Sequence, residues 1–343
     1  MLIKIKQGWE VPEASVTPER LVFNRRGMLK GLGLTALTGA LASCDNSSSV
    51  AQSAPPGGSG AAPQAVQAAQ AASSADPTAK LYPVKRNPAY VLDRPLTNES
   101  IIASYNNYYE FNSSKDVVAE AQALPIRPWE ISIEGMVDKP FKTDFDSLIK
   151  LMPLEERLYR HRCVETWSFT AAWSGFPMKA LVDYAKPSSG AKYVVMKSFM
   201  NPNFAPGEKQ PWYPWPYTEG LTIAEATHDM AFMVTGAYGK PLLKQNGAPL
   251  RLATPWKYGF KSAKGIQRFI FTDKRPVTYW QQLAQEEYGF WANVNPKVPH
   301  PRWSQDSETS LTTGARVPTL LFNGYAAQVA GLYANLQAEP LYM

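Results

Sequence analysis

The sequence predicts a mixed α+β fold with mostly non-parallel sheets and peripheral helices. Segments with strand and helix patterns do not alternate strictly along the chain, which argues against a doubly wound parallel sheet. The connections between these segments are irregular and rich in Pro, Gly and Trp. After a low-complexity stretch, about 260 residues remain from Tyr82 to Met343, which is enough for one large domain or two small ones. We expect a single domain at residues 81–343.

Each predicted element rests on a local pattern of apolar residues. Alternating apolar and polar residues, or short apolar runs between turn signals, predict strands; they are found at 129–134, 191–199, 230–235, 249–253 and 266–271. Helical periodicity predicts helices at 176–185, 222–228 and 277–287.

The N-terminal residues 1–44 have the features of an export signal. A polar region ends in the pair Arg25 and Arg26, and an uncharged, mostly apolar stretch follows at 31–43. That stretch is far shorter than the roughly 20 residues that a membrane-spanning helix needs. The arginine pair resembles a twin-arginine signal, which predicts export to the periplasm in a folded state. An ordinary secretory signal with incidental arginines is the alternative.

The end of this segment, residues 41–44 (LASC), resembles a bacterial lipobox. In a lipobox the cysteine is lipidated and becomes the first residue of the mature chain. Asp45 follows Cys44, and an aspartate at this place commonly accompanies retention at the inner membrane. The pattern therefore predicts a chain anchored to the inner membrane through lipidated Cys44. Cleavage at a nearby Ala-x-Ala-like site without lipidation is the alternative.

Residues 45–80 are expected to form a disordered tether. This stretch consists mainly of Ala, Ser, Gly, Pro and Gln and has no aromatic residue. Such a composition cannot bury enough apolar area to offset the entropy lost on ordering. The Ala- and Gln-rich run at 61–72 predicts at most a marginal helix, without the apolar face that docking would need.

The rest of the chain has the composition of an enzyme-sized globular domain. It contains all 17 Tyr and all but one of the 10 Trp, which predicts a large core and an aromatic-lined cleft. The formal net charge of +6 includes the basic leader, and no basic run with interleaved aromatics indicates nucleic-acid binding. With two cysteines, the chain has no disulfide framework, no Cys-x-x-Cys-His haem motif and no Fe–S cysteine set.

Cys163 therefore needs an explanation of its own. It lies at the centre of residues 160–168 (RHRCVETWS), beside two arginines and a histidine. Nearby positive charge lowers the pKa of a thiol, and the thiolate is the form that acts as a nucleophile or a soft-metal ligand. We therefore expect a thiolate. A structural cysteine buried as a small apolar residue is the alternative.

A series of motifs around Cys163 resembles the sulfite-oxidase-fold molybdoenzymes. Within that superfamily, the series is most similar to the catalytic subunits of the periplasmic, molybdopterin-dependent protein-methionine-sulfoxide reductases. The motifs follow one another in the expected order over essentially all of Tyr82 to Tyr333. They are residues 105–111 (YNNYYEF), 160–168 (RHRCVETWS), 173–177 (WSGFP), 238–240 (YGK), 245–251 (QNGAPLR), 255–261 (PWKYGFK), 288–296 (YGFWANVNP) and 300–305 (HPRWSQ). The resemblance implies a sulfite-oxidase-type molybdopterin-binding fold.

The resemblance also implies roles for individual residues. Cys163 corresponds to the protein ligand of molybdenum. Residues that correspond to molybdopterin contacts are Asn106, Tyr109, Glu110, Ser198 (where the family often has threonine), Asn246, Arg251, Ser262, Ala263 and Lys264. Arginine, lysine and backbone amides are suited to a phosphate-bearing cofactor. Without the resemblance, residues 251–265 would be interpreted as a solvated basic loop.

Two further residues are candidates for work at the metal's open side. Asn107 and Glu165 flank the cofactor motifs, and either could position solvent or hold a proton. Equally, Glu165 could neutralise Arg160 or Arg162. The three histidines do not show metal-ligand spacing, so structural hydrogen-bonding roles are expected for them. Residues 212–217 (WYPWPY) are interpreted either as an aromatic rim that accepts a thioether or as a surface loop packed on the core.

The implied activity is the reduction of methionine sulfoxide in envelope proteins by oxygen-atom transfer to a Cys-ligated molybdenum centre. Because the chain has no electron-carrying motif of its own, the electrons are expected from another protein. The resemblance implies that this partner is a membrane-embedded haem b subunit. A lipid anchor and a flexible tether would keep this partner close. The alternatives are a sulfite oxidase-like molybdoenzyme, which needs several cationic groups around an open pocket, and a metal-free lipoprotein that serves as a binding module.

Overall fold

The computed structural model describes residues 61–342, which lie in one compact unit of the chain. The predicted signal, the lipobox and residues 45–60 of the expected tether lie outside the described residues. The strands are β1 (Glu130–Gly135), β2 (Phe141–Asp144), β3 (Glu155–Arg162), β4 (Trp167–Pro177), β5 (Tyr193–Ser198), β6 (Thr218–Thr222), β7 (Phe232–Ala237), β8 (Lys240–Pro241), β9 (Arg251–Ala253), β10 (Ile266–Thr272), β11 (Ser307–Ser310) and β12 (Arg316–Pro318). The α-helices are α3 (Ala61–Ser74), α4 (Glu99–Ser104), α5 (Val118–Ala121), α6 (Phe145–Leu148), α7 (Met178–Ala185), α8 (Ile223–Ala226), α9 (Tyr279–Leu283) and α10 (Ala326–Val329).

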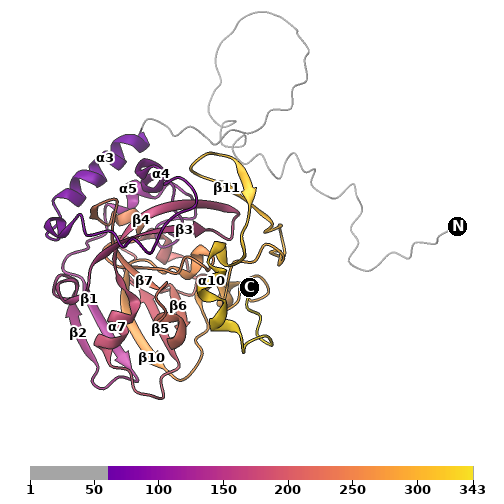
Figure 1. Ribbon diagram of the computed structural model, residues 1–343. Helices are drawn as coiled ribbons and strands as arrows, with labels where there is room; N and C mark the ends of the chain where they lie inside the picture. Colours follow the sequence, from indigo (N-terminus) through magenta and orange to yellow (C-terminus); the bar gives the residue numbers. More distant parts are fainter. Residues whose placement is uncertain (1–60, 343) are drawn as a thin grey trace, which may run out of the picture. The chain divides into compact units, whose positions relative to one another are not determined.

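Two sheets form the framework of the described residues. The five-stranded sheet has the order β2-β1-β10-β5-β6, and all its pairs are antiparallel except β1 with β10. The seven-stranded sheet has the order β12-β11-β4-β7-β8, with β3 paired to β4 and β9 paired to β7; here only β11 and β4 are parallel among the described pairs. Figure 1 shows the first sheet with α7 in the lower half of the view, and β3, β4 and β11 in the upper half. The mixed α+β class with mostly non-parallel sheets is thus confirmed.

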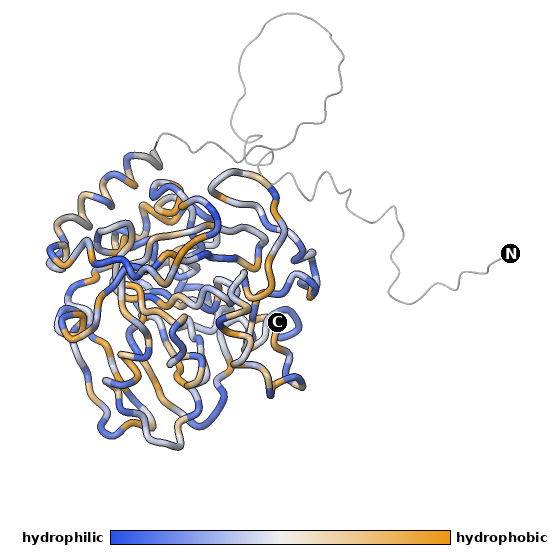
Figure 2. Tube along the Cα trace, in the orientation of Figure 1, coloured by the Kyte–Doolittle hydropathy of each residue, from blue (hydrophilic) through white to orange (hydrophobic). Residues whose placement is uncertain are grey.

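The apolar pattern of the sequence accounts for most of the elements that it predicts. All five expected strands are present, as β1, β5, β7, β9 and β10. Apolar segments follow the strands in Figure 2, while the loops at their ends are mostly hydrophilic. The helix α7 buries Met178, Leu181, Val182 and Ala185 at helical spacing. The helix expected at 277–287 ends early, at Leu283, because Ala284 has the extended φ of −156°.

The β3–β4 hairpin, which carries the site, is not among the predicted strands. Eight pairs join the two strands, from Glu155 opposite Gly175 to Arg162 opposite Ser168. β4 is buried along almost its whole length, although from Trp167 to Ser174 apolar residues alternate with small residues, mostly Ser and Thr. β3 contains several charged residues. Ion pairs compensate them, one within the strand and the others with distant segments.

The expected tether needs correction over residues 61–80. Residues 61–74 form the helix α3, in which Val66 and Ala69 are 7% and 3% exposed. They pack with Ala103 of α4, Val118 of α5 and Leu243. Because the neighbouring alanines are small, Val66 can provide the apolar face for docking that the composition does not predict. Among residues 61–342, no helix is both long and apolar enough to cross a bilayer.

Candidate active site

Cys163 lies in the turn that connects β3 to β4. Its amide donates a hydrogen bond to the Trp167 carbonyl at 2.9 Å, and the Thr166 amide donates to the Cys163 carbonyl at 3.1 Å. Thr166 closes the turn with a φ of 65°, a left-handed conformation that non-glycine residues adopt rarely. The hairpin therefore holds the cysteine in a defined place, with only 4% of its surface exposed.

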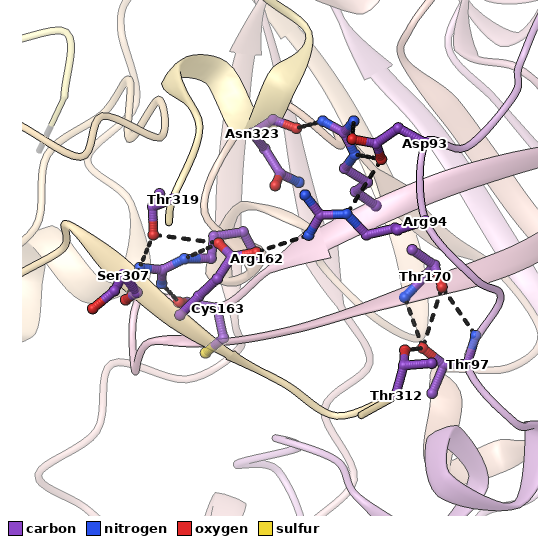
Figure 3. A network of polar contacts seen from close by, with 12 residues as sticks. Asp93, Arg94, Thr97, Arg162, Cys163, Thr170, Ser307, Thr312, Thr319 and Asn323 are labelled. Carbon is purple, nitrogen blue, oxygen red and sulfur yellow. Dashed lines mark hydrogen bonds and ion pairs between the residues drawn. The ribbon is translucent and has the colours of Figure 1, made fainter. Parts of the chain in front are cut away.

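The two flanking arginines form ion pairs with carboxylates of other segments. Arg162 forms a buried ion pair with Glu308 at 2.8 Å, and Arg160 pairs with Asp93 at 2.5 Å. Figure 3 shows the Arg162 guanidinium within a network that includes Ser307 and Thr319, and the Cys163 sulfur takes no part in that network. Arg162 does lower the thiol pKa, as expected, but opposing effects outweigh it. Burial, followed by the Glu165 carboxylate, raises the pKa of Cys163 to about 12.

Glu165 and Asn107, the two residues expected at the open side of the metal, both lie beside the Cys163 sulfur. The Asn107 amide nitrogen is 3.5 Å from Cys163 Sγ, and Glu165 Oε2 is 3.8 Å from it. Glu165 accepts hydrogen bonds from Asn107 at 3.1 Å and from the Trp167 indole at 2.9 Å. Its ion-pair partner is Lys115, at 2.6 Å, rather than Arg160 or Arg162.

Lys115 determines the charge of the Glu165 carboxyl group. Burial alone would raise the pKa of Glu165, but the Lys115 ammonium and the donated hydrogen bonds lower it. Glu165 is therefore a carboxylate at neutral pH and holds no proton for the reaction. No sequence signal marks Lys115, which stands in a polar loop; only the fold brings it to the site.

A cavity of about 290 Å³ opens above the cysteine. All the residues expected at the catalytic and cofactor positions line it, with the exception of Ser198. Ser198 is buried behind the wall, where a hydrogen bond from it lowers the pKa of Glu110. The lining residues named by the sequence are Asn106, Asn107, Tyr109, Glu110, Cys163, Glu165, Asn246, Arg251, Ser262, Ala263 and Lys264.

Two segments that are far apart in the sequence are clamped together at one end of the cavity. The Asn246 amide donates to the Asn106 side-chain oxygen at 2.8 Å and to the Ile102 carbonyl at 3.0 Å. Lys264 donates to the Asn107 carbonyl at 2.8 Å, which closes the other side. The predicted contacts with one cofactor thus come from segments that the fold fastens to one another.

Arg251 and Lys264 give the cavity positive charge that is not compensated. Among the described residues, the four other deeply buried cations each have a carboxylate partner. They are Arg157, Arg162, Lys257 and Lys261, with Glu155, Glu308, Glu225 and Glu219 at 2.5, 2.8, 2.5 and 2.5 Å. Arg251, by contrast, is 4% exposed and forms no ion pair with any described residue.

Burial lowers the pKa of Arg251 to about 10, and burial together with Arg251 lowers that of Lys264 to about 7. Burying a cation without a counterion is costly, so the cavity is built for an anionic guest. A phosphate-bearing cofactor fits this requirement.

The mouth of the cavity is aromatic, but its residues differ from those expected. Of the loop 212–217, only Tyr217 reaches the lining, while Trp212 is 65% exposed. The aromatic wall instead includes Trp280, Tyr288 and Trp303, which the sequence analysis did not assign to the site.

Arg302 joins them: its guanidinium lies 5.0 Å from the Trp303 ring centroid and donates to Glu287 at 2.7 Å. Placing these side chains at the mouth required the tertiary structure, because the motif at 300–305 does not reveal which of its residues face the cavity.

Two of the three histidines make hydrogen bonds outside the cavity lining, whereas His161 lies in the lining itself. His161 lines the cavity and stacks on Phe169 at 4.5 Å, and burial holds its pKa well below the usual value, so the ring is neutral. His228 lies 3.1 Å from the Gln328 carbonyl, and His300 stacks on Trp303 at 3.8 Å. Within the described residues, no group of three or more His, Cys, Asp or Glu side chains could hold a metal ion. A metal in this cavity therefore needs ligands from its cofactor besides Cys163.

Comparison with known proteins defines the class. Residues 118–280 match the family model described as "Oxidoreductase molybdopterin binding domain". That range contains Cys163, Glu165, Asn246 and Arg251. This stretch is just under half of the chain, and it identifies a molybdenum-dependent oxidoreductase. The predicted cofactor, molybdenum bound to molybdopterin, is thereby confirmed.

One solved structure similar to this chain is the sulfane dehydrogenase SoxCD from Paracoccus pantotrophus, with 16% sequence identity and a TM-score of 0.42. The match covers 68% of this chain and 61% of that chain, which is less than two thirds of the latter.

Proposed function

We propose that the protein reduces methionine sulfoxide in envelope proteins to methionine, at a molybdenum centre whose protein ligand is Cys163. The observation that carries the proposal is the aromatic lining of the cavity that also holds Cys163; it includes Tyr109, Trp280, Tyr288 and Trp303. The sulfur of a methionine side chain packs favourably against aromatic rings. The ordered motif series between Tyr82 and Tyr333 supports the same reaction.

In the proposed reaction, the residues that line the cavity have different roles. Cys163 supplies the thiolate, since binding to a metal removes the thiol proton. Arg251 and Lys264 balance the negative charge of the cofactor, and Asn106 and Asn246 hold its two enclosing segments together. Asn107, between Cys163 and the ionised Glu165, fixes the orientation of both. When bound, the molybdenum centre supplies oxygen-atom transfer and two-electron chemistry.

The proposal also covers the electron donor and the location of the enzyme. The electrons would come from another protein, because neither cysteine of the chain belongs to a haem or Fe–S motif. The motif series supports a membrane-embedded haem b subunit as this donor. Export by the twin-arginine route to the periplasm and an inner-membrane anchor on lipidated Cys44 would place the enzyme beside that donor. A mass spectrum of the mature N-terminus tests the anchor: an acylated Cys44 supports it, and an unmodified later residue at the N-terminus refutes it.

One observation favours a sulfite oxidase-like activity instead. Arg302 stands at the cavity mouth with 59% of its side chain exposed, and Arg251 and Lys264 lie in the lining. Several cations around an open pocket are what an oxyanion such as sulfite needs. The reaction with sulfite runs in the opposite direction and requires an electron acceptor.

One comparison of turnover separates the two activities. The protein is produced in a host that makes molybdopterin, and its molybdenum content is measured. Reduced viologen with an oxidised, methionine-sulfoxide-containing protein tests the proposed reaction, and sulfite with an artificial acceptor tests the alternative. Sulfoxide-dependent oxidation of viologen by near-stoichiometrically loaded enzyme supports the proposal. Loaded enzyme that oxidises sulfite and leaves the sulfoxide unreduced would refute it.

A further inference from the structure

Two buried carboxyl groups lie on adjoining segments at the back of the cavity. Glu110 is 3% exposed and lines the cavity, and Glu208 is 4% exposed and lies in the short 3-10 helix Pro206–Lys209. Gly207 joins the two segments: a Cβ there would stand 2.0 Å from the Tyr109 carbonyl oxygen and 2.8 Å from that of Glu110. This close backbone approach, which only glycine permits, brings Glu208 beside Glu110.

Neither carboxyl group has a cationic partner. Glu219, Glu225 and Glu308 are equally buried, and each is paired with a lysine or an arginine. Among the described residues, Glu110 and Glu208 form no ion pair. Glu208 accepts a hydrogen bond from the Asn201 amide through Oε2, while its Oε1 is buried without any hydrogen-bond partner. A buried, unpaired carboxylate is costly, so both groups favour the neutral acid.

The charges around the pair agree with this geometry. Burial, and secondarily Glu110, raise the pKa of Glu208 to about 8, while burial raises that of Glu110 to about 7 against the opposing effect of Lys264. Arg251 also lies in the lining.

The tyrosines around Glu110 are not competing proton sources. Burial raises the pKa of Tyr108, Tyr217 and Tyr279, so these three stay neutral. Lys264 is the other group near Glu110 that titrates close to neutrality.

The proposed reaction consumes two protons. Reduction of a sulfoxide by two electrons and two protons breaks the bond between sulfur and oxygen and releases the sulfide and one water. The electrons come from the redox partner or from reduced viologen. Glu165 cannot give a proton, because Lys115 holds it ionised.

We propose that Glu110 and Glu208 form a proton relay, in which Glu110 donates into the cavity and Glu208 returns a proton to Glu110. The inference rests on the proposed function. Lys209, which follows Glu208 in the chain, is exposed. Glu208 acts through Glu110 and is a positioning residue, whereas Glu110 lines the same cavity as Cys163.

The test uses the molybdenum-loaded enzyme with Glu208→Gln. Glutamine has the shape of the neutral acid, so the fold and the molybdenum content should be retained. With reduced viologen and an oxidised protein, kcat should fall about tenfold at pH 8, with a smaller loss at pH 6 and an unchanged KM. Direct general acid catalysis contributes about 10²–10⁴-fold, and Glu208 acts only through Glu110. Glu208→Asp, which keeps an acid, should restore part of the rate. Glu130→Gln, at an exposed site, is the matched control and should behave as wild type.

A second readout does not depend on turnover. Infrared spectroscopy of the wild type at pH 7 should show a protonated carboxyl band. Glu208→Gln should weaken this band, leaving the contribution of Glu110, and Glu130→Gln should leave it unchanged. If the wild type failed to reduce the sulfoxide, the proposed function would fail while this band still supported the carboxyl pair. Absence of the band at pH 7, or a Glu208→Gln variant with the wild-type kcat from pH 6 to pH 8, would overturn the relay.

Discussion

Arg162 and Glu308 form an ion pair of 2.8 Å in which the side chains are 0% and 1% exposed. Arg162 also donates to the carbonyl of Cys163, so the pair supports the turn that carries the metal ligand. Arg162→Met would leave Glu308 buried with only Arg94, 3.1 Å away. Breaking a buried pair from one side costs about 3–5 kcal/mol. Urea unfolding of the metal-free variant should show that loss in the free energy of unfolding.

Two further variants control this measurement. Lys179→Met breaks the exposed pair with Asp183, which should cost only about 0.3–0.5 kcal/mol. Arg162→Met combined with Glu308→Leu removes both charges and should recover part of the stability. An Arg162→Met variant no less stable than Lys179→Met would show that the pair does not hold the turn.

Binding of the cofactor phosphate should depend on Arg251, whereas the stability of the metal-free fold should not. Because Arg251 is buried without a carboxylate partner among the described residues, Arg251→Met should leave the metal-free protein at least as stable as the wild type. The same variant should retain little molybdenum, and Arg251→Lys should retain an intermediate amount, since lysine lacks the bidentate fork. Thermal unfolding and metal analysis on the same preparations check both statements. A fully loaded Arg251→Met protein would remove this residue from the cofactor site.

The Cys163 thiol should titrate late when the metal is absent. Its pKa of about 12 lies well above the value of about 8.5 for a free cysteine. In a Cys44→Ser background, alkylation by iodoacetamide should therefore still accelerate between about pH 9 and pH 10.5, where an ordinary thiol has reached its plateau. Glu165→Gln removes the carboxylate that raises the pKa and should speed alkylation at pH 8. A wild-type rate that levels off near pH 9 would contradict the assignment.

The sequence reveals this site better than it reveals the scaffold beneath it. Cys163 and Arg251 are marked by their motifs, and the cavity brings both together. The β3–β4 hairpin is missed although β4 alternates apolar residues with Ser and Thr, because β3, its partner, carries charges that ion pairs neutralise only in the folded protein.

The charge state of Cys163 is a second property that the sequence alone does not predict. Neighbours in the chain suggest a thiolate, yet Arg160 and Arg162 bind Asp93 and Glu308, which come from distant segments. Lys115, which is far from Cys163 in the sequence, controls Glu165 instead. Position in the sequence therefore identifies the ligand, whereas its electrostatic surroundings come from the tertiary structure.

The paired acids predict how stability should depend on pH. An unfolded glutamate has a pKa near 4.5, whereas folding raises the pKa of Glu208 to about 8. Between these values the folded state binds the proton and the unfolded state does not, so this contribution to stability is present at pH 5 and is lost as the pH rises through 8. Lys264 acts in the opposite direction above pH 7, because its folded pKa is lowered to about 7.

The difference between Glu208→Gln and the wild type isolates the glutamate from these other groups. At pH 5 the two metal-free proteins should have similar free energies of unfolding, since glutamine replaces a neutral acid. At pH 9 the wild type must bury a carboxylate, and the variant should be the more stable of the two. Urea unfolding at pH 5, 7 and 9 measures the difference, with Glu130→Gln as a control that should stay constant. A difference that does not change with pH would mean that Glu208 is already ionised in the folded protein at pH 5.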